Sequence, residues 1–162
     1  MTLETWINWC KEATRQQKEL KVGYIPMYRL KINLSVAAAR FAVALENHWC
    51  WYRETEVERE DIIREAVGLA EAIANIHNQS RVPKQDGYLV VRYEYDREIR
   101  KLRNNTKNVD RVIYDLQSLE STLQRLGKLL ALLEHIGISF EEIDAAISSK
   151  EKAGHVYQIT AE

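Results

Sequence analysis

Acidic side chains gather at the start of one expected helix, in the stretch "EREDIIRE". Glu58, Asp61 and Glu65 are spaced i, i+3 and i+7, which places their carboxylates on one helix face. Three like charges repel one another, and a hard divalent cation such as Mg²⁺ offsets that repulsion through oxygen ligands. The alternative is a solvated helix start, because carboxylates stabilise the N-terminal end of a helix and Arg59 and Arg64 lie within reach.

The preceding helix offers a second candidate face, built mainly from small residues. Ser35, Ala39, Ala42 and Glu46 lie together on one side of it, away from its apolar stripe. Small side chains allow another helix or a ligand to approach closely. Ala39 and Ala42 are therefore candidates for a binding surface or for close helix packing. Glu46, the only carboxylate on this face, is the candidate metal ligand that would join the acidic cluster of the next helix.

Two tryptophans end this second helix. Trp49 and Trp51 point in nearly opposite directions if both are helical, so one can enter the core while the other needs an interface or a ligand. His48 and His77 lie on apolar stripes, where a histidine is usually a hydrogen-bonded core residue. Neither has a histidine or cysteine at metal-ligand spacing, so no zinc site is predicted. No Ser/His/Asp arrangement or glycine-rich phosphate loop is recognisable.

The composition indicates an all-α fold. The chain has 162 residues, with only 6 glycines and 2 prolines, whereas many-stranded folds need turn residues often. This length suits a single domain over residues 1–162 with a core of its own. We expect a helical bundle of about five to six helices.

Periodicity and capping signals place the elements. Helices are expected over about residues 2–20, 26–52, 56–78 and 140–152, with "TEVE" and "SFEE" as capping boxes for the last two. Residues 79–88 are expected to form a loop, and the tail 154–162 to fray or pack as an extended arm. Residues 88–95 fit a strand or a helix, and the sequence leaves both open.

The strongest pattern is an apolar repeat over residues 109–133. Its apolar residues alternate in steps of three and four, which predicts one long heptad-patterned helix packed against neighbours. Gly137 then suits the left-handed conformation that closes a helix. The repeat consists of Val109, Val112, Leu116, Leu119, Leu123, Leu126, Leu130 and Leu133.

Charge and hydropathy narrow the partners. The formal net charge is -1, which gives no long-range attraction to nucleic acid or anionic lipid. A nucleic-acid-binding small subunit is therefore the weakest alternative. No apolar run is long enough to span a bilayer, so no membrane partner is expected. Cys10 and Cys50 form no disulfide framework, which favours a cytoplasmic protein.

Several segments taken in order resemble a known family. "WCWYR", "EREDII" and the ending "EHIGISFEEIDAAISSKEKAGHVY" are similar to the all-α nucleoside triphosphate pyrophosphatases, which include MazG-like enzymes and dimeric dUTPases. In that family an E-x-x-E pair and an E-x-x-D pair on successive helices hold magnesium, which polarises the phosphate chain and activates a water. The resemblance implies that Glu58 and Asp61 form the second pair and that Lys150 lies on the closing helix.

The first acidic pair departs from the family pattern. Its two positions fall on Ala39 and Ala42, and Glu46 lies one turn later on the same face. The resemblance therefore implies a nucleotide-binding protein whose magnesium site and catalysis are weakened or lost. The alternative from the residues alone is a non-enzymatic helical interaction protein, a homo-oligomer or the partner of another protein. The leucine repeat, the small-residue face and the second tryptophan favour that alternative.

Overall fold

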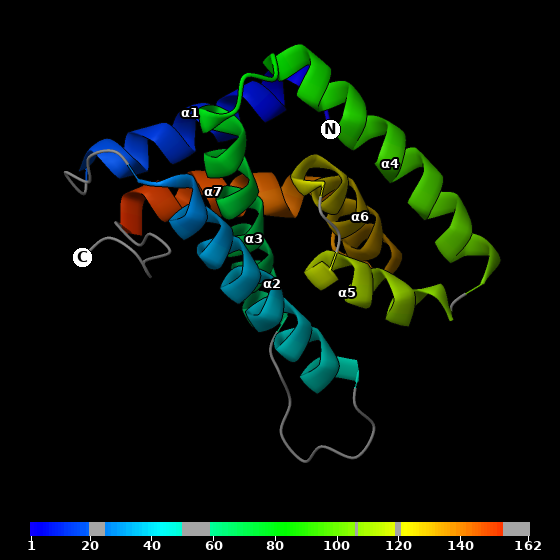
Figure 1. Cartoon of the computed structure of the whole chain (residues 1–162). Coiled ribbons are helices and arrows are strands. Elements are labelled where there is room, and N and C mark those ends of the chain that lie inside the picture. The colour runs from blue at the N-terminus through cyan, green and yellow to red at the C-terminus, as the bar shows by residue number, and fades with distance from the viewer. Residues whose placement is uncertain (20–24, 50–58, 106, 119–120, 154–162) are drawn as a thin grey trace.

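The computed structural model describes residues 1–19, 25–49, 59–105, 107–118 and 121–153, and it confirms the all-α bundle. All secondary structure in these residues is helical (Figure 1). None of these helices is long and apolar enough to cross a membrane. In chain order the helices are α1 (Leu3–Glu19), α2 (Met27–Trp49), α3 (Arg59–Gln79), α4 (Lys84–Asn104), α5 (Asn108–Ser118), α6 (Thr122–His135) and α7 (Phe140–Ala153).

Helix α3 is the centre of the bundle. It contacts α1, α2, α6 and α7, and Figure 1 shows α2 running beside it. Residues 66–74 of α3 are buried on every side, which an ordinary surface helix does not show. Ala66, Ala70 and Ala74 supply small side chains there, so several helices can approach the same backbone.

Helices α4 and α6 form the most extensive helix pair. Leu126, Leu129 and Leu130 of α6 are buried beside Val91 and Leu102 of α4. The pair is very close at Gly127, where an added Cβ would lie 2.6 Å from the carbonyl oxygen of Val91. Only glycine permits this approach of two helix backbones.

The prediction of one continuous helix over residues 109–133 is wrong, because the apolar repeat is divided between α5 and α6. Ser121 has an extended backbone (φ −73°, ψ 114°) and its hydroxyl accepts a hydrogen bond from the amide of Gln124. This N-cap begins a new helix. The apolar stripe itself is confirmed on both sides of the break, from Val112 and Leu116 to Leu126. The break gives seven helices in the described residues where five to six were expected.

The closing turn before α7 matches its prediction. Gly137 adopts φ 92°, the left-handed conformation. The amide of Ser139 donates to the Glu142 carboxylate at 2.8 Å, and the Glu142 amide donates to the Ser139 hydroxyl at 3.2 Å, a reciprocal capping box. Arg59 at the start of α3 pairs with Glu142 at 2.6 Å, which ties α3 to this turn.

The region that was open between strand and helix is helical. Residues 88–95 lie inside α4, which begins at Lys84, within the expected loop of residues 79–88. Pro83 explains the early start, because a helix does not need the amide that proline lacks at this end. The predicted "TEVE" capping box lies outside the described residues. The predicted tail, residues 154–162, also lies outside them.

Candidate functional site

The predicted metal site is only partly within the described residues. Glu46 is exposed near the end of α2 and Asp61 is half-buried in the first turn of α3, while Glu58 lies outside the described residues. Across the described ranges, no three histidine, cysteine, aspartate or glutamate side chains gather where they could hold a metal ion. A metal site of three such side chains would therefore include at least one residue that lies outside these described side chains.

Arg64 supplies the positive charge that this acidic helix start requires. Its Nη2 lies 2.7 Å from Oδ1 of Asp61, and its Nε lies 3.8 Å from Oε1 of Glu65. The mutual repulsion of the carboxylates is thus offset by an arginine on the same helix. This pairing fits the alternative that the sequence offered, a charged helix start, while the position of Glu58 lies outside the described residues.

The other predicted residues fall into two groups. Trp51 lies outside the described residues, and Trp49 and Lys150 belong to α2 and α7 without a described side chain. Ala39 is exposed and Ala42 is half-buried. The small-residue face of α2 is therefore not filled by another helix of the described bundle.

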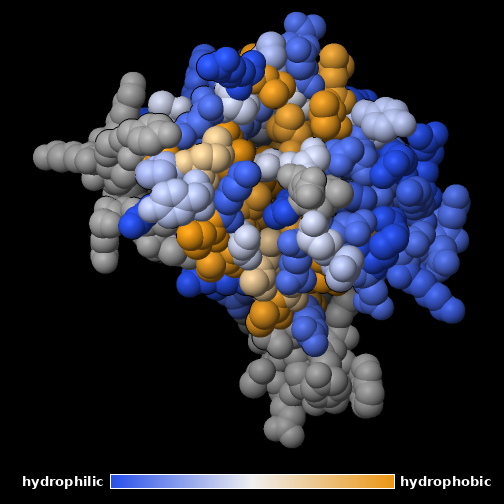
Figure 2. Space-filling view, in the orientation of Figure 1, coloured by the Kyte–Doolittle hydropathy of each residue, from blue (hydrophilic) through white to orange (hydrophobic). Residues whose placement is uncertain are grey.

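This uncovered side of α2, which we call the outer face, also carries large apolar residues. Helix α2 packs against α3 and α5 through Leu34, Phe41 and neighbouring core residues. On the opposite side Tyr28 is 61% exposed, Ile32 47% and Val43 57%. Figure 2 shows hydrophobic side chains among hydrophilic ones on the side of the molecule along which α2 runs. The sequence identified the small residues of this face, whereas the flanking large ones were missed.

The outer face repeats in helical steps and is charged at both ends. Tyr28, Ile32, Ser35, Ala39, Ala42 and Glu46 are separated by alternating steps of four and three, the spacing of a helix-pairing seam. Lys31 is exposed near its N-terminal end and Glu46 is exposed at its C-terminal end. The outer face thus has small and apolar residues along its length, a positive charge near its N-terminal end and a negative charge at its C-terminal end.

A buried ionic network that was not predicted from the sequence joins α4, α5 and α6. Lys128 of α6 is 3% exposed, and its Nζ lies 2.7 Å from Glu98 and 3.1 Å from Glu94, both on α4. Arg111 and Asp115 of α5 extend the network, with Arg111 Nη2 2.7 Å from Glu98. Mutual pairing of this kind is what allows charges to be buried.

Hydrogen bonds outweigh burial in setting the charge states of this network. Burial by itself raises the pKa of Glu98, but the hydrogen bonds from Arg111 and Lys128 bring that pKa below its ordinary value. Burial likewise acts to lower the pKa of Lys128, and its hydrogen bonds to Glu98 and Glu94 raise it instead. Both groups are therefore charged in the folded protein at neutral pH.

A sequence signal for the network exists in retrospect. Lys128 interrupts the run "LGKLLALL", so a charge stands where its neighbours are buried leucines. Glu94 and Glu98 are spaced i, i+4 and share a face of α4. The two signals become a prediction only when α4 is known to be helical and to pack on α6.

His77 is buried as its position predicted, but its ring forms no hydrogen bond with the described residues. Its ring centroid lies 5.1 Å from that of Trp6, and it is 3% exposed. Within the described part of the chain, neither ring nitrogen has a hydrogen-bond partner, and nor does Nε1 of Trp6. Burial, and secondarily the charge of Lys84, lowers the pKa of His77. The ring is therefore neutral at neutral pH.

No known protein family, curated protein or solved structure matches the chain.

Proposed function

We propose that this chain is a non-enzymatic helical interaction protein that pairs with a second copy of itself through the outer face of α2. The observation that carries this proposal is the exposed apolar seam of Tyr28, Ile32, Ala39 and Val43, opposite the buried side of the same helix. A monomer gains nothing from a row of large apolar side chains in water, whereas a partner helix would bury them.

The charges of the face favour an antiparallel pair of identical helices. In such a pair the contact is symmetric, so the N-terminal end of each α2 lies beside the C-terminal end of the other. Lys31 and Arg29 of one copy would then lie near Glu46 of the second copy. Ser35 and Ala39 would meet close to the symmetry axis, where small side chains allow the backbones to approach. A parallel pair would place like charges together at both ends.

The test is the mass of the protein in solution. Sedimentation equilibrium of the whole chain should give a dimer, and the double variant Ile32→Glu/Val43→Glu should weaken the dimer at least about a hundredfold, because it places like charges across the seam. The matched control is Val82→Glu/Tyr114→Glu, which alters two other exposed apolar residues and the net charge equally. A monomeric wild-type protein, or a variant that dimerises like the wild type, would refute the proposal.

The resemblance to pyrophosphatases leads to a different proposal, and thermal unfolding separates the two. A nucleotide site at Glu46, Glu58 and Asp61 requires the melting temperature to rise with nucleoside triphosphate and Mg²⁺ together. An interaction protein should show no such rise. A magnesium-dependent rise that Asp61→Asn abolishes would favour the nucleotide-binding function.

A further inference from the structure

Four exposed cations lie at the C-terminal end of α4, and we call them the basic patch. None of them forms an ion pair with a carboxylate of the described residues. Cations in the last turn of a helix stabilise that end of it, but this accounts for only two of the four. The basic patch consists of Arg100, Lys101 and Arg103 of α4 and Lys107 in the turn before α5.

Burial and pairing of the acidic side chains leave this surface more positive than the sequence suggests. Residues 92–111 contain seven lysines and arginines and four aspartates and glutamates. Two of the four acids, Glu94 and Glu98, are buried in the ionic network described above, and a third, Asp96, pairs with Arg92 at 3.5 Å. The formal net charge of -1 counts these acids against the exposed cations. It therefore understates the attraction of this end of α4 for a polyanion.

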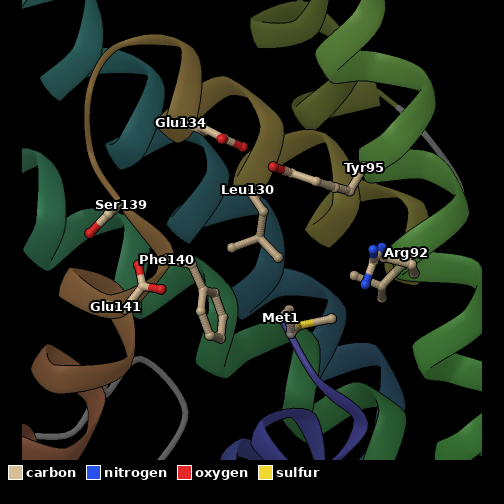
Figure 3. A pocket seen from close by; sticks show the side chains of 9 residues that line it. Met1, Arg92, Tyr95, Leu130, Glu134, Ser139, Phe140 and Glu141 are labelled. Carbon is tan, nitrogen blue, oxygen red and sulfur yellow. The ribbon is translucent and has the colours of Figure 1, made fainter.

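An exposed aromatic ring lies beside the basic patch. Figure 3 shows Tyr95 directed from α4 toward α6, where Leu130 lies. Tyr93, two residues earlier, lies on the other side of α4 and is 68% exposed. Arg100 follows Tyr93 at i+7, so the ring and the guanidinium share one helix face, and Leu89, 55% exposed, precedes Tyr93 by one turn. The solvent-facing side of α4 thus has an aromatic and apolar half and a cationic half.

This combination fits single-stranded nucleic acid better than other polyanions. Unpaired bases stack on exposed aromatic rings while lysine and arginine bind the phosphates. In a duplex the bases are stacked on one another, so Tyr93 would have no base to stack on. A helix that lies on an anionic membrane combines apolar and cationic residues along its whole length, whereas on α4 the apolar residues and the unpaired cations occupy different halves.

We propose that the solvent-facing side of α4 binds single-stranded nucleic acid without sequence preference. The phosphates pair with the basic patch, and a base stacks on Tyr93. At 1.5 Å per residue, the face from Leu89 to Arg103 is about 21 Å long, enough for a few nucleotides. This surface belongs to a different helix from the outer face of α2, so the inference goes beyond the proposed pairing of two copies.

Fluorescence anisotropy of a labelled oligothymidylate titrated with the whole chain tests the proposal. If the four cations each neutralise one phosphate, the affinity should fall about 50-fold between 50 and 200 mM salt. In Arg100→Gln/Lys101→Gln, the affinity at 50 mM salt should fall at least about tenfold, and its change between the two salt concentrations should shrink to about sevenfold. The matched control Arg81→Gln/Lys11→Gln removes one exposed arginine and one exposed lysine elsewhere and should bind like the wild type.

A second variant separates stacking from charge. Tyr93→Ala should lower the affinity for oligothymidylate at least about fivefold and leave the salt dependence unchanged, because no cation is removed. All these substitutions lie at exposed positions, so folding is retained, which circular dichroism checks.

Three other polyanions decide the class of partner. Duplex DNA, poly-L-glutamate and phosphatidylserine vesicles should each bind more weakly than oligothymidylate at the same salt concentration. Binding of any one of them as tight as that of the single strand would overturn the proposal. An unchanged affinity in the Arg100/Lys101 variant, or no binding of oligothymidylate at 50 mM salt, would overturn it as well. The dimer test uses residues of α2 alone, so either proposal can fail without the other.

Discussion

Lys128 of α6 joins α4 and α5 through buried ion pairs. Its ammonium has Glu98, Glu94 and Asp115 within 3.3 Å, and Lys128 and both glutamates are buried. Removing one partner of a buried ion pair leaves the others charged in a medium that solvates them poorly. Arg111 would still pair with Glu98 and Asp115, and Arg97 with Glu94 at 2.9 Å, but the buried cation that joins the two glutamates would be lost.

We therefore expect Lys128→Met to lower the free energy of unfolding by about 3–5 kcal/mol, although methionine is close to lysine in length. Urea denaturation at pH 7 measures the change. The control Lys101→Met alters an exposed lysine of α4 and should stay within about 0.5 kcal/mol of the wild type. A loss below about 1 kcal/mol for Lys128→Met would show that the network contributes little.

The lowered pKa of His77 predicts that the stability of the fold decreases at acidic pH. Burial, and next the charge of Lys84, depresses the pKa of the folded histidine below 6.5, while the unfolded chain takes up the proton near its ordinary value. The unfolded state binds more protons below about pH 6.5, so stability is present above that pH and is lost as the pH falls toward the folded pKa.

In His77→Leu this loss between about pH 6.5 and pH 5 should disappear. The substitution strands no hydrogen bond, because both ring nitrogens lack a partner in the described residues. Thermal unfolding at pH 7.5 and pH 5.5 measures the difference. His135→Gln, on a half-buried histidine in the last turn of α6, should retain the wild-type dependence. An unchanged slope in His77→Leu would assign the acid sensitivity to other groups.

At the scale of helices, the approach of α4 to α6 is set by Gly127. Helix propensity alone favours alanine over glycine by about 1 kcal/mol. The added Cβ, however, would lie 2.6 Å from the Val91 oxygen and 2.9 Å from the Tyr95 nitrogen, both backbone atoms. No change of side-chain rotamer relieves those contacts, so the two helices must separate.

Gly127→Ala should therefore destabilise the protein by about 1–3 kcal/mol, against its helix propensity. The contrasting case is Gly87, where the added Cβ meets Cε1 of the His77 side chain at 2.7 Å. Gly87→Ala should be tolerated better in a His77→Ala background than in the wild type, whereas Glu94→Ala should not rescue Gly127→Ala. Urea denaturation of the two double-mutant cycles measures both effects. A neutral Gly127→Ala would mean that the helices adjust without cost.

Helix starts and stops were predictable where local chemistry decides them. The "SFEE" capping box and Gly137 involve residues adjacent in the chain, and the structure confirms both. The break before Ser121 was hidden because the leucine spacing continues through it, and apolar periodicity reports burial rather than backbone continuity. The pattern "STLQ" contains a serine three residues before a glutamine, a capping signal that the prediction did not use.

For the whole molecule, the fold class followed from composition and periodicity, while the sites did not. Few glycines and prolines and strong helical stripes are sufficient for an all-α bundle. The positive charge at the end of α4, by contrast, depends on the burial of Glu94 and Glu98 against α6, which only tertiary packing determines. The outer face of α2 was half predicted, because small residues are recognisable in sequence but the absence of a covering helix is not.

The buried charges also determine which alignment of α4 and α6 is permitted. The buried apolar surface of α6 is nearly uniform, so on its own it would allow α4 to pack in more than one alignment. It is formed by Leu126, Leu129, Leu130 and Leu133. A slip of one helical turn, about 5.4 Å, would leave either Glu94 or Glu98 without Lys128 in a dry interior. The ion pairs of Lys128 thus favour one alignment of α4 and α6 over others in which the leucine contacts would be similar.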